Sequence, residues 1–458
     1  MIPEILLVVL MLAVVGYLII NKHEASLCLI IGGLILLTGA WLLGHPLYEA
    51  DASTGFGLFD VLMKLKDTIV GQLGGAGLVI MILFGYSAYM SKIGANQMTV
   101  DIMVKPLKGI KHKALFVPVV FLLGNLMSLV VPSASSLAII LMSILYPILV
   151  RMGISAMTAA GVIACTATIM PTPLGADNVI AAETLGYGLI DYVAYNAKIA
   201  LPVLAIMALA HFLWQNWCDK KEGEAAFVSI DQDKLQVQEK ANVPTCYALF
   251  PLLPLILILG VGIAAMFLDG IKMDIFVLTF LSFLVVLIVE IIRNKSLKIA
   301  EASAKEMFVG MGRGFSQVVM LVVGGSLFTN GIQALGLIDA LTASVEGSTS
   351  AGLMVMLLFA GATMLFGILA GGGLSMFYAV IALIPGIAAA AGVDGIIVAL
   401  PMQLIANLAR GISPVAAVIM IVAATVGVAP TKVLKRTAIP SLIGIAFVML
   451  LSVLLLPY

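Results

Sequence analysis

The stretch Asn407-Leu408-Ala409-Arg410-Gly411-Ile412-Ser413-Pro414 carries the only charged residue of an apolar run from about Gly395 to Val428. That run is long enough to cross a bilayer. An arginine near its middle costs about 2.5–3.5 kcal/mol on insertion scales, which marks a functional site. Gly411 and Pro414 interrupt a helix and release backbone groups. A cation beside free backbone donors suits a small anion, so we predict an anion site at Arg410. The alternatives are an arginine that reaches the membrane surface from a hairpin end, or one that pairs with a buried acid.

The composition of the whole chain excludes a soluble domain. Its 458 residues are 62% hydrophobic and 10% charged, with a mean hydropathy of +1.18. Repeated apolar runs of membrane-spanning length predict an all-α polytopic membrane protein embedded in the lipid bilayer. The formal net charge is zero, which implies no nucleic-acid partner. The sequence contains no His/Asp/Glu metal motif, nucleophile elbow or phosphate loop, so we expect neither an enzyme nor a resident cofactor or metal.

A polar stretch at 219–242 divides the chain into two similar halves, 1–218 and 243–458, and we interpret it as a cytoplasmic linker. Each half begins with two spans and an amphipathic segment, continues with a third span, and closes with a last span. The spans of the first half are 3–20, 25–43, 75–92 and 190–217, and its amphipathic segment is 59–72. Those of the second half are 246–268, 273–292, 315–336 and 438–457, and its amphipathic segment is 296–311.

Two interrupted apolar stretches lie between the third and last spans of each half. In the first half they are 114–150, broken at 132–136, and 156–186, broken at 171–178. In the second half they are 351–390, broken at 371–375, and 395–428, broken around 410–414. Matched interrupted segments in two halves are the best sequence indication of a transporter site.

Either member of each pair can be the re-entrant hairpin while the other crosses the membrane. Placing the hairpin first puts Arg151 inside and Asp394 outside, which agrees with the excess of basic residues in cytoplasmic loops. We therefore interpret 114–150 and 351–390 as hairpins, and 156–186 and 395–428 as crossing helices that unwind near their middles. Each half then has five transmembrane helices and one hairpin.

The distribution of Lys and Arg predicts the orientation. If Glu4 lies outside, every Lys and Arg falls on the inner side except Lys64, Lys66, Lys198, Lys272 and the intramembrane Arg410. Such asymmetry sets topology, so both termini are expected outside. Five crossings per half make the second half run opposite to the first. This arrangement is an inverted repeat, which permits alternating access.

Four stretches of sequence resemble one known family. They are Ala52-Ser53-Thr54-Gly55; Gly85-Tyr86-Ser87-Ala88-Tyr89-Met90 with Ile93-Gly94-Ala95-Asn96; Ser128-Leu129-Val130-Val131-Pro132-Ser133-Ala134-Ser135; and Ala210-His211-Phe212-Leu213-Trp214-Gln215 with Asp219-Lys220-Lys221-Glu222. Over most of its length the chain resembles the anaerobic C4-dicarboxylate carrier family of the DcuC type, within the ion transporter superfamily. The resemblance implies secondary transport of succinate, fumarate or malate across a bacterial inner membrane, by exchange or by ion-coupled uptake or efflux. The superfamily implies an elevator movement and a homodimer.

A dicarboxylate needs hydrogen-bond donors at both ends and little fixed negative charge. Hairpin tips and unwound helices that meet at mid-membrane supply hydroxyls, freed amides and positive helix N-termini. The predicted substrate-binding residues are Ser133, Ser135, Ser136, Thr172, Ser375, Asn407, Arg410 and Ser413, with the amides of Gly371 to Gly373.

Asp177 and Asn178 form the other polar pair in an apolar crossing segment. An acid inside the membrane is expensive and is usually functional or paired. Asp177 is interpreted as a proton carrier, as a Na⁺ ligand together with carbonyl oxygens, or as the salt-bridge partner of Arg410. The sequence leaves open whether the coupling ion is Na⁺, H⁺ or none.

Three competing functions remain from the sequence. The alternatives to a dicarboxylate carrier are a carrier for another organic anion or an amino acid, an anion channel, and an intramembrane enzyme. A channel would favour a basic ring, and an enzyme would need a nucleophile paired with a base; the sequence shows neither pattern.

Overall fold

The computed structural model describes residues 2–21, 23–109, 116–131, 133–223, 243–265, 274–336 and 351–456. The regular structure in these ranges is helical throughout, which confirms the predicted all-α class. Among the described residues, 11 helices are long and apolar enough to cross a membrane. Most of the predicted linker at 219–242 lies outside the described residues.

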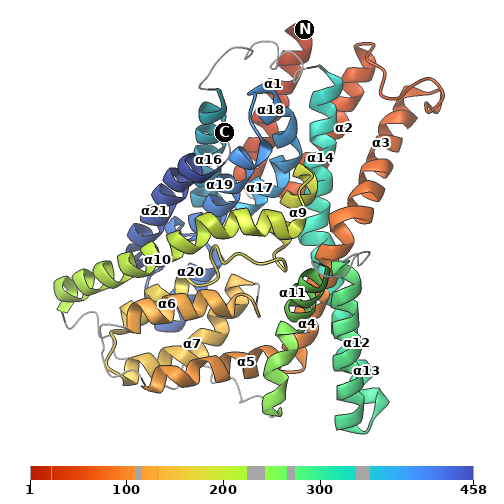
Figure 1. The fold of residues 1–458 in the computed structure, drawn as a ribbon. Helices are drawn as coiled ribbons and strands as arrows, with labels where there is room; N and C mark the ends of the chain where they lie inside the picture. The colour runs from red at the N-terminus through yellow and green to blue at the C-terminus, as the bar shows by residue number, and fades with distance from the viewer. Residues whose placement is uncertain are drawn as a thin grey trace.

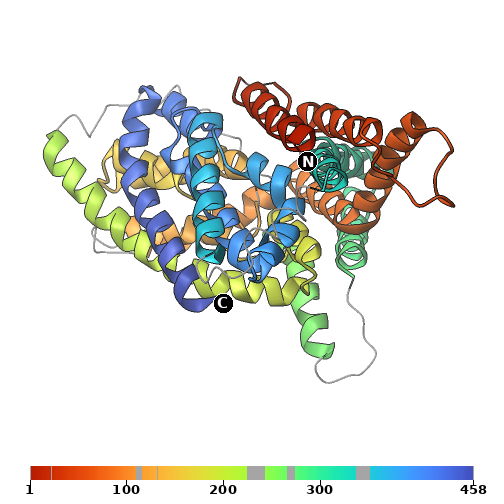
Figure 2. The same ribbon diagram turned by 90° about the horizontal axis from the view of Figure 1, so that it is seen from above.

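The helices form two bundles that stand side by side (Figure 2). The side bundle contains α1 (Ile2–Ile20), α2 (Ala25–Leu42), α3 (Gly57–Gln72), α4 (Leu78–Lys92), α11 (Leu253–Ala265), α12 (Ile275–Asn294), α13 (Leu297–Gly314) and α14 (Met320–Ala334). The core bundle contains α6 (Phe116–Met127), α7 (Ala134–Arg151), α8 (Ala156–Ala164), α9 (Ala176–Leu185), α10 (Leu189–Glu222), α16 (Ala351–Ala370), α17 (Leu374–Val380), α18 (Ile384–Ala390), α19 (Gly395–Leu408), α20 (Ala417–Val426) and α21 (Pro430–Leu455). A short helix, α5 (Ala95–Val104), connects the bundles near the foot of α4 (Figure 1).

Helices from different halves interlock in the side bundle. α2 packs along α14, and α4 packs along α13. Glycines permit both approaches: a side chain at Gly33 would meet the backbone of Leu327, and one at Gly310 would meet the carbonyl of Phe84. In lipid the hydrophobic effect does not drive helices together. Small residues at such contacts let the helices approach closely, so that van der Waals packing stabilises them.

Only one of the two amphipathic segments continues smoothly into the following span: α13 passes through the π-helical turn Phe315–Val319 into α14. A kink within Leu73–Gly77 separates α3 from α4, where Gly75 has the non-helical backbone angles φ −95° and ψ −125°. The sequence predicted an amphipathic segment separate from the span. The kink at Gly75 agrees with that boundary in the first half. In the second half a π turn absorbs the change in helical register without ending the helix.

The core bundle contains the four interrupted stretches. α6 and α7 are joined by 128–133, α16 and α17 by 371–373, α8 and α9 by 165–175, and α19 and α20 by 409–416. The first unwound segment begins earlier than the sequence predicted, because α8 ends at Ala164 rather than near Pro171. Asp177 and Asn178, which were assigned to that segment, lie in the first turn of α9. The positive end of that helix is a favourable environment for the carboxylate of Asp177.

Candidate functional site

The second unwound segment positions Arg410. α19 gives way to a 3₁₀ turn, Ala409–Ile412, and then to extended backbone before α20. Thr437 of α21 holds this segment from one side, since its hydroxyl donates to the Gly411 carbonyl at 2.7 Å. Ser413 holds it from the other side, since its buried hydroxyl donates to the Ile368 carbonyl at 2.7 Å. The unwound backbone is therefore fixed rather than loose.

Arg410 is half-buried and binds oxygen atoms of neutral groups only. Its Nε donates to the Asn407 carbonyl at 3.1 Å, and Nη2 donates to the Ala167 carbonyl at 2.7 Å and to Asn407 Oδ1 at 3.0 Å. Among the described residues no hydrogen bond or ion pair engages Nη1, and no carboxylate pairs with the guanidinium. Two nitrogens thus orient the group while the third stays available.

The loop between α16 and α17, residues 371–373, lies directly against this arginine. The Gly373 amide donates to the Ala406 carbonyl at 3.1 Å, and a side chain added at Gly372 would touch the Arg410 stem. Gly371 adopts φ +88°, a left-handed conformation that glycine accepts without steric cost. The three predicted glycines therefore bring the backbone of this loop against the unwound segment.

The first unwound segment, 165–175, contributes a backbone carbonyl from a residue with strained backbone angles. Ala167 has φ +54°, a conformation that non-glycine residues rarely adopt, and its carbonyl accepts from Arg410. Asn125 of α6 fixes this segment: its Oδ1 accepts from the amide and the hydroxyl of Thr168 at 3.0 and 2.8 Å. Strain that its surroundings hold in place is typical of ligand-binding sites.

Asp177 and Arg410 are linked through Asn407. Asn407 Nδ2 donates to Asp177 Oδ2 at 2.9 Å, while Asn407 Oδ1 accepts from Arg410. The ion pairs among the described residues include none between Asp177 and Arg410, so the direct salt bridge that the sequence left open is absent here. The acid and the base are coupled through a neutral amide, and each keeps capacity for another ligand.

Asn178 belongs to a buried polar cluster behind Asp177. Its Nδ2 donates to the Thr172 carbonyl at 3.0 Å, and its Oδ1 accepts from Asn196 and from Gln403 at 2.8 and 2.9 Å. The hydroxyl of Tyr192 donates to Gln403 Oε1 at 2.6 Å. These bonds join α9, α10 and α19, and each contributes about 0.5–1.5 kcal/mol net.

The predicted hydroxyls have different environments. Ser133 caps α7 by accepting from the Ser136 amide at 3.3 Å, and both side chains are exposed. Thr172 is buried and its hydroxyl accepts from the Leu174 amide at 3.2 Å. Ser135 is half-buried, and Ser375 is exposed on α17. Among the described residues no hydrogen bond joins the Ser133–Ser136 tip to Arg410 or Asp177.

Several residues at the site were not predicted from the sequence. Gln403 precedes Asn407 by four residues, so helical spacing alone places both on one face of α19 and could have identified it. Asn125, Ala167 and Tyr378 gave no such signal. Tyr378 is 7% exposed and interacts electrostatically with both Asp177 and Arg410.

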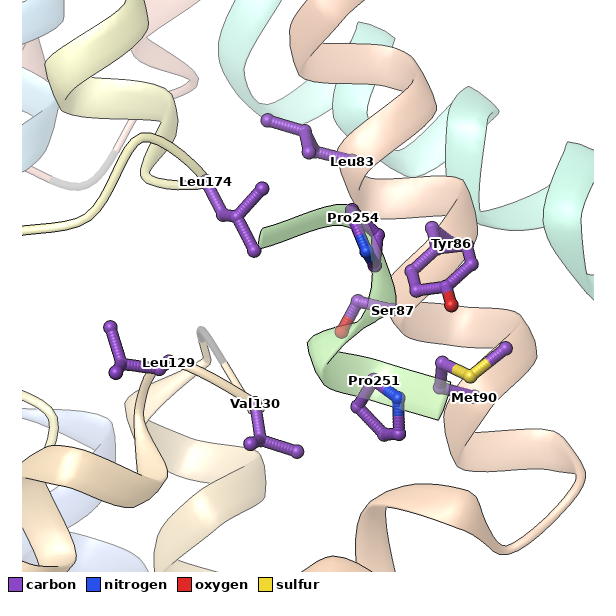
Figure 3. A pocket seen from close by; sticks show the side chains of 9 residues that line it. All are labelled: Leu83, Tyr86, Ser87, Met90, Leu129, Val130, Leu174, Pro251 and Pro254. Atoms are coloured by element: carbon purple, nitrogen blue, oxygen red, sulfur yellow. The ribbon is translucent and has the colours of Figure 1, made fainter. Parts of the chain in front are cut away.

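An apolar seam separates the two bundles on the side nearer α5. Leu129, Val130 and Leu174 extend from the core bundle toward Ser87 of α4 and Pro251, around a cavity of about 20 Å³ (Figure 3). Neither this cavity nor a larger one beside α3 and α14 includes Arg410. The polar site is thus packed within the core bundle.

Comparison with known proteins gives matches along the whole chain. A sequence model of the family described as "C4-dicarboxylate anaerobic carrier" matches residues 2–457. The anaerobic C4-dicarboxylate transporter DcuC of Escherichia coli O6:H1 is 34% identical, with 99% of this chain and 97% of that protein covered. A probable anaerobic C4-dicarboxylate transporter of Vibrio cholerae is 33% identical, with 99% and 98% covered.

A solved structure also matches the fold. MtrF of Neisseria gonorrhoeae, described as one of a class of antimetabolite efflux pumps, superposes with a TM-score of 0.57. The match covers 96% of this chain and 97% of that chain at 14% sequence identity. At this identity the likeness concerns the fold alone.

Proposed function

The chain belongs to the DcuC family of C4-dicarboxylate anaerobic carriers, and we propose that it transports succinate, fumarate or malate with Arg410 as the residue that binds one substrate carboxylate. Its family consists of multi-pass membrane transporters and not of enzymes. The predicted transport function is confirmed at the level of the family.

This proposal rests on the hydrogen bonding of Arg410, in which only two of the three guanidinium nitrogens have partners among the described residues. Carbonyl oxygens hold Nε and Nη2, which sets the plane of the guanidinium and leaves Nη1 without a partner among the described residues. A carboxylate that binds there gains a charge-assisted hydrogen bond in a site with little competing water. Orientation by the protein reduces the entropy that substrate binding must overcome.

The second carboxylate requires donors from elsewhere in the core bundle. The exposed hydroxyls of Ser133 and Ser136 at the first hairpin, with Ser135 beside them, are our candidates, together with Ser375 on the second hairpin. Thr172 and Ser413 are assigned a supporting role, because their hydroxyls already bond to backbone atoms.

Asp177 is proposed to bind or carry the coupling ion. The carboxylate lies at the start of α9 and accepts from Asn407, which also bonds to Arg410. Binding of Na⁺ or H⁺ at Asp177 would alter the charge that Arg410 senses through this amide. Asn178 supports the arrangement by tying Thr172 to α10 and α19.

We further propose that the two halves are inverted repeats and that the core bundle moves against the side bundle as an elevator. The order of helices around the paired interruptions supports the repeat, and the separation into two bundles supports the movement (Figure 2). The side bundle would form the contact in a homodimer. Both ends of the chain lie toward the upper part of Figure 1, in keeping with termini that share the outer side.

Counterflow in proteoliposomes tests the function. Vesicles loaded with unlabelled succinate should accumulate labelled succinate, while gluconate and arginine should neither compete nor exchange. Repeating the assay with and without Na⁺, and at two pH values, identifies the coupling ion. Exchange of gluconate or arginine in place of succinate would assign another substrate class, and flux without counterflow stimulation would indicate a channel.

Thiol labelling tests the orientation. A cysteine introduced at Gln232, in a Cys246→Ser background, should resist an impermeant reagent in intact cells, since the linker is expected in the cytoplasm. Ready labelling of Gln232→Cys in intact cells would reverse the orientation. Gln232 lies outside the described residues, so this expectation depends on the distribution of Lys and Arg.

A further inference from the structure

Glu183 is an acid at the border between the two bundles that the proposed function does not use. It lies in the last turn of α9, a helix of the core bundle that packs against the break between α3 and α4 of the side bundle (Figure 1). The ion pairs among the described residues include none with Glu183. Its carboxylate therefore needs a partner other than a cationic side chain.

The break in the side bundle frees a backbone amide. Gly75 has φ −95° and ψ −125°. The peptide group that follows it is thus turned by about 80° from its orientation in a helix. This rotation directs the Ala76 amide away from the acceptor that a continuous helix would provide. Ala76 is buried, and a buried amide without an acceptor costs free energy, so the break calls for an acceptor from outside the helix.

Glu183 supplies that acceptor from the other bundle. Its carboxylate accepts a hydrogen bond from the Ala76 amide. Glu183 Oε1 also lies so close to the Gly75 backbone that a methyl group on Gly75 would overlap it, whereas one on Gly74 would meet nothing within 4 Å. Gly75 and Ala76 thus form a notch, here called the glycine notch, which the carboxylate fills.

The other half of the chain contains neither the acid nor the break. α9 and α20 are both 10 residues long, and each ends before a glycine in the left-handed conformation, Gly186 and Gly427. Three residues before these glycines stand Glu183 and Ala424. The turn Phe315–Val319 of the second half continues into α14 without a kink. The acid and the break occur together, which indicates that they serve each other.

The neighbouring contacts between the bundles are of a different kind. The Ala379 backbone rests on Gly325 of α14. Leu129, Val130 and Leu174 face α4 around the small cavity described above. Such van der Waals contacts have no preferred direction and permit displacement. A hydrogen bond to a carboxylate has a defined length and direction, so the glycine notch selects one position of the core bundle.

We propose that Glu183 is a positioning residue of the transport cycle. Its carboxylate docks in the glycine notch, holds the core bundle against the side bundle in the arrangement of this structure, and leaves the notch when the core bundle moves. The proposal rests on the bundle movement of the proposed function. It predicts that loss of the contact lowers the population of the docked arrangement.

Crosslinking across the border measures that population. Ser87 of α4 and Val130 of the core bundle line the same cavity (Figure 3). Ser87→Cys with Val130→Cys, in a Cys246→Ser background, should therefore be joined by a short bifunctional thiosulfonate. Glu183→Ala should slow this reaction by about threefold to tenfold, because one hydrogen bond to a charged group is lost at an exposed position. Glu183→Gln keeps an acceptor oxygen and should slow it less. An unchanged rate in Glu183→Ala would overturn the proposal.

Gly75→Ala and Gly74→Ala form a matched pair of controls. A methyl group at Gly75 overlaps the Glu183 carboxylate, so Gly75→Ala should slow crosslinking as much as Glu183→Ala. Gly74→Ala should stay within about twofold of the parent, as is usual for a substitution that meets no neighbour. Combining Gly75→Ala with Glu183→Ala should add nothing, since the methyl group then meets no carboxylate. Equal effects of the two glycine substitutions, or additive effects in the combined variant, would refute docking in the notch.

Transport by the crosslinked protein reports separately on the bundle movement. Joining Ser87→Cys to Val130→Cys should arrest succinate counterflow, and reduction of the link should restore it. Full transport by the crosslinked protein would refute the movement itself. Arrested transport together with an unchanged crosslinking rate in Glu183→Ala would refute the role of Glu183 alone.

Discussion

Two arginines of this chain are enclosed by protein, and their partners differ. Arg436 is fully buried, and two carboxylates bind it: Asp219 at 2.7 Å from Nη1 and Glu222 at 2.6 Å from Nη2. Arg410 is half-buried and binds only carbonyl and amide oxygens among the described residues. Arg436 thus has carboxylate counter-charges from the protein. Among the described residues no carboxylate is in direct contact with Arg410.

The difference is what we expect between an arginine with a structural role and the arginine proposed to bind the substrate. A desolvated cation requires compensation, and carboxylates on α10 supply it for Arg436, which joins α10 to α21. At Arg410 the oriented oxygens compensate in part, and a carboxylate from the substrate would complete the arrangement. The same residue type therefore ties two helices of the core bundle together at one site and, in the proposed function, binds the substrate at the other.

Removing Arg436 should produce the larger loss of stability. Arg436→Ala leaves Asp219 and Glu222 without their partner and should lower the free energy of unfolding by about 3–5 kcal/mol, the usual result of breaking a buried pair. Thermal unfolding of the purified protein in detergent measures this, with Arg410→Ala as the comparison at about 1–2 kcal/mol from its unpaired carbonyls. If Arg410→Ala destabilises as much as Arg436→Ala, both arginines are structural.

Arg410→Lys tests the proposed role of Arg410 in recognising the substrate. Lysine keeps the charge but loses the planar fork that the Asn407 and Ala167 oxygens orient. Transport of succinate should fall by about tenfold or more, and transport of a monocarboxylate should fall less if Arg410 reads the second carboxylate. Competition assays in proteoliposomes compare the two substrates, and an equal loss for both would remove this role from Arg410.

Asp177→Asn tests whether the start of α9 binds or carries the coupling ion. The substitution keeps the size and the hydrogen bond from Asn407 possible, yet removes the charge. The dependence of succinate transport on Na⁺ or on pH should be abolished, while transport at a saturating ion concentration falls by about tenfold or less. A loss of transport with unchanged ion dependence would make Asp177 a structural partner.

The smallest effect is expected for the amide that joins the two charges. Asn407→Ala removes the bonds to Asp177 and to Arg410 Nη2 but keeps the backbone carbonyl that holds Nε. A double-mutant cycle of Asn407→Ala with Asp177→Asn should give a coupling of about 0.5–1.5 kcal/mol in succinate affinity. Additive effects would show that Asn407 transmits nothing between the two sites.

The sequence singles out one arginine as intramembrane, which stays a prediction, and misjudges the surroundings of the other. Arg410 is recognisable because no other charge occurs between 395 and 428. Arg436 follows Lys432 and Lys435 and was counted with the charges of the inner side, although its side chain is fully buried. Its partners lie more than two hundred residues earlier on α10, so only the folded chain reveals the pairing.

The interrupted helices show the same limit of prediction from sequence, because contacts between distant segments set their boundaries. Glycine and proline in apolar runs predicted that the stretches would be interrupted, because these residues cannot maintain the helical ladder. The boundary at Ala164 was missed, because Asn125 of another helix bonds to the unwound residues. The bonds of Asn407 to Asp177 likewise join segments far apart in the sequence.

Equilibrium binding of succinate to purified Arg410→Ala and Arg436→Lys proteins tests the central claim most directly. Both variants must first show the helical content and cooperative unfolding of the native protein. Arg410→Ala should bind succinate about 2–5 kcal/mol more weakly, the loss expected when a desolvated charge pair is broken. Arg436→Lys should bind within about threefold of the native protein. Unchanged affinity in folded Arg410→Ala would contradict the assignment of Arg410 as the carboxylate receptor.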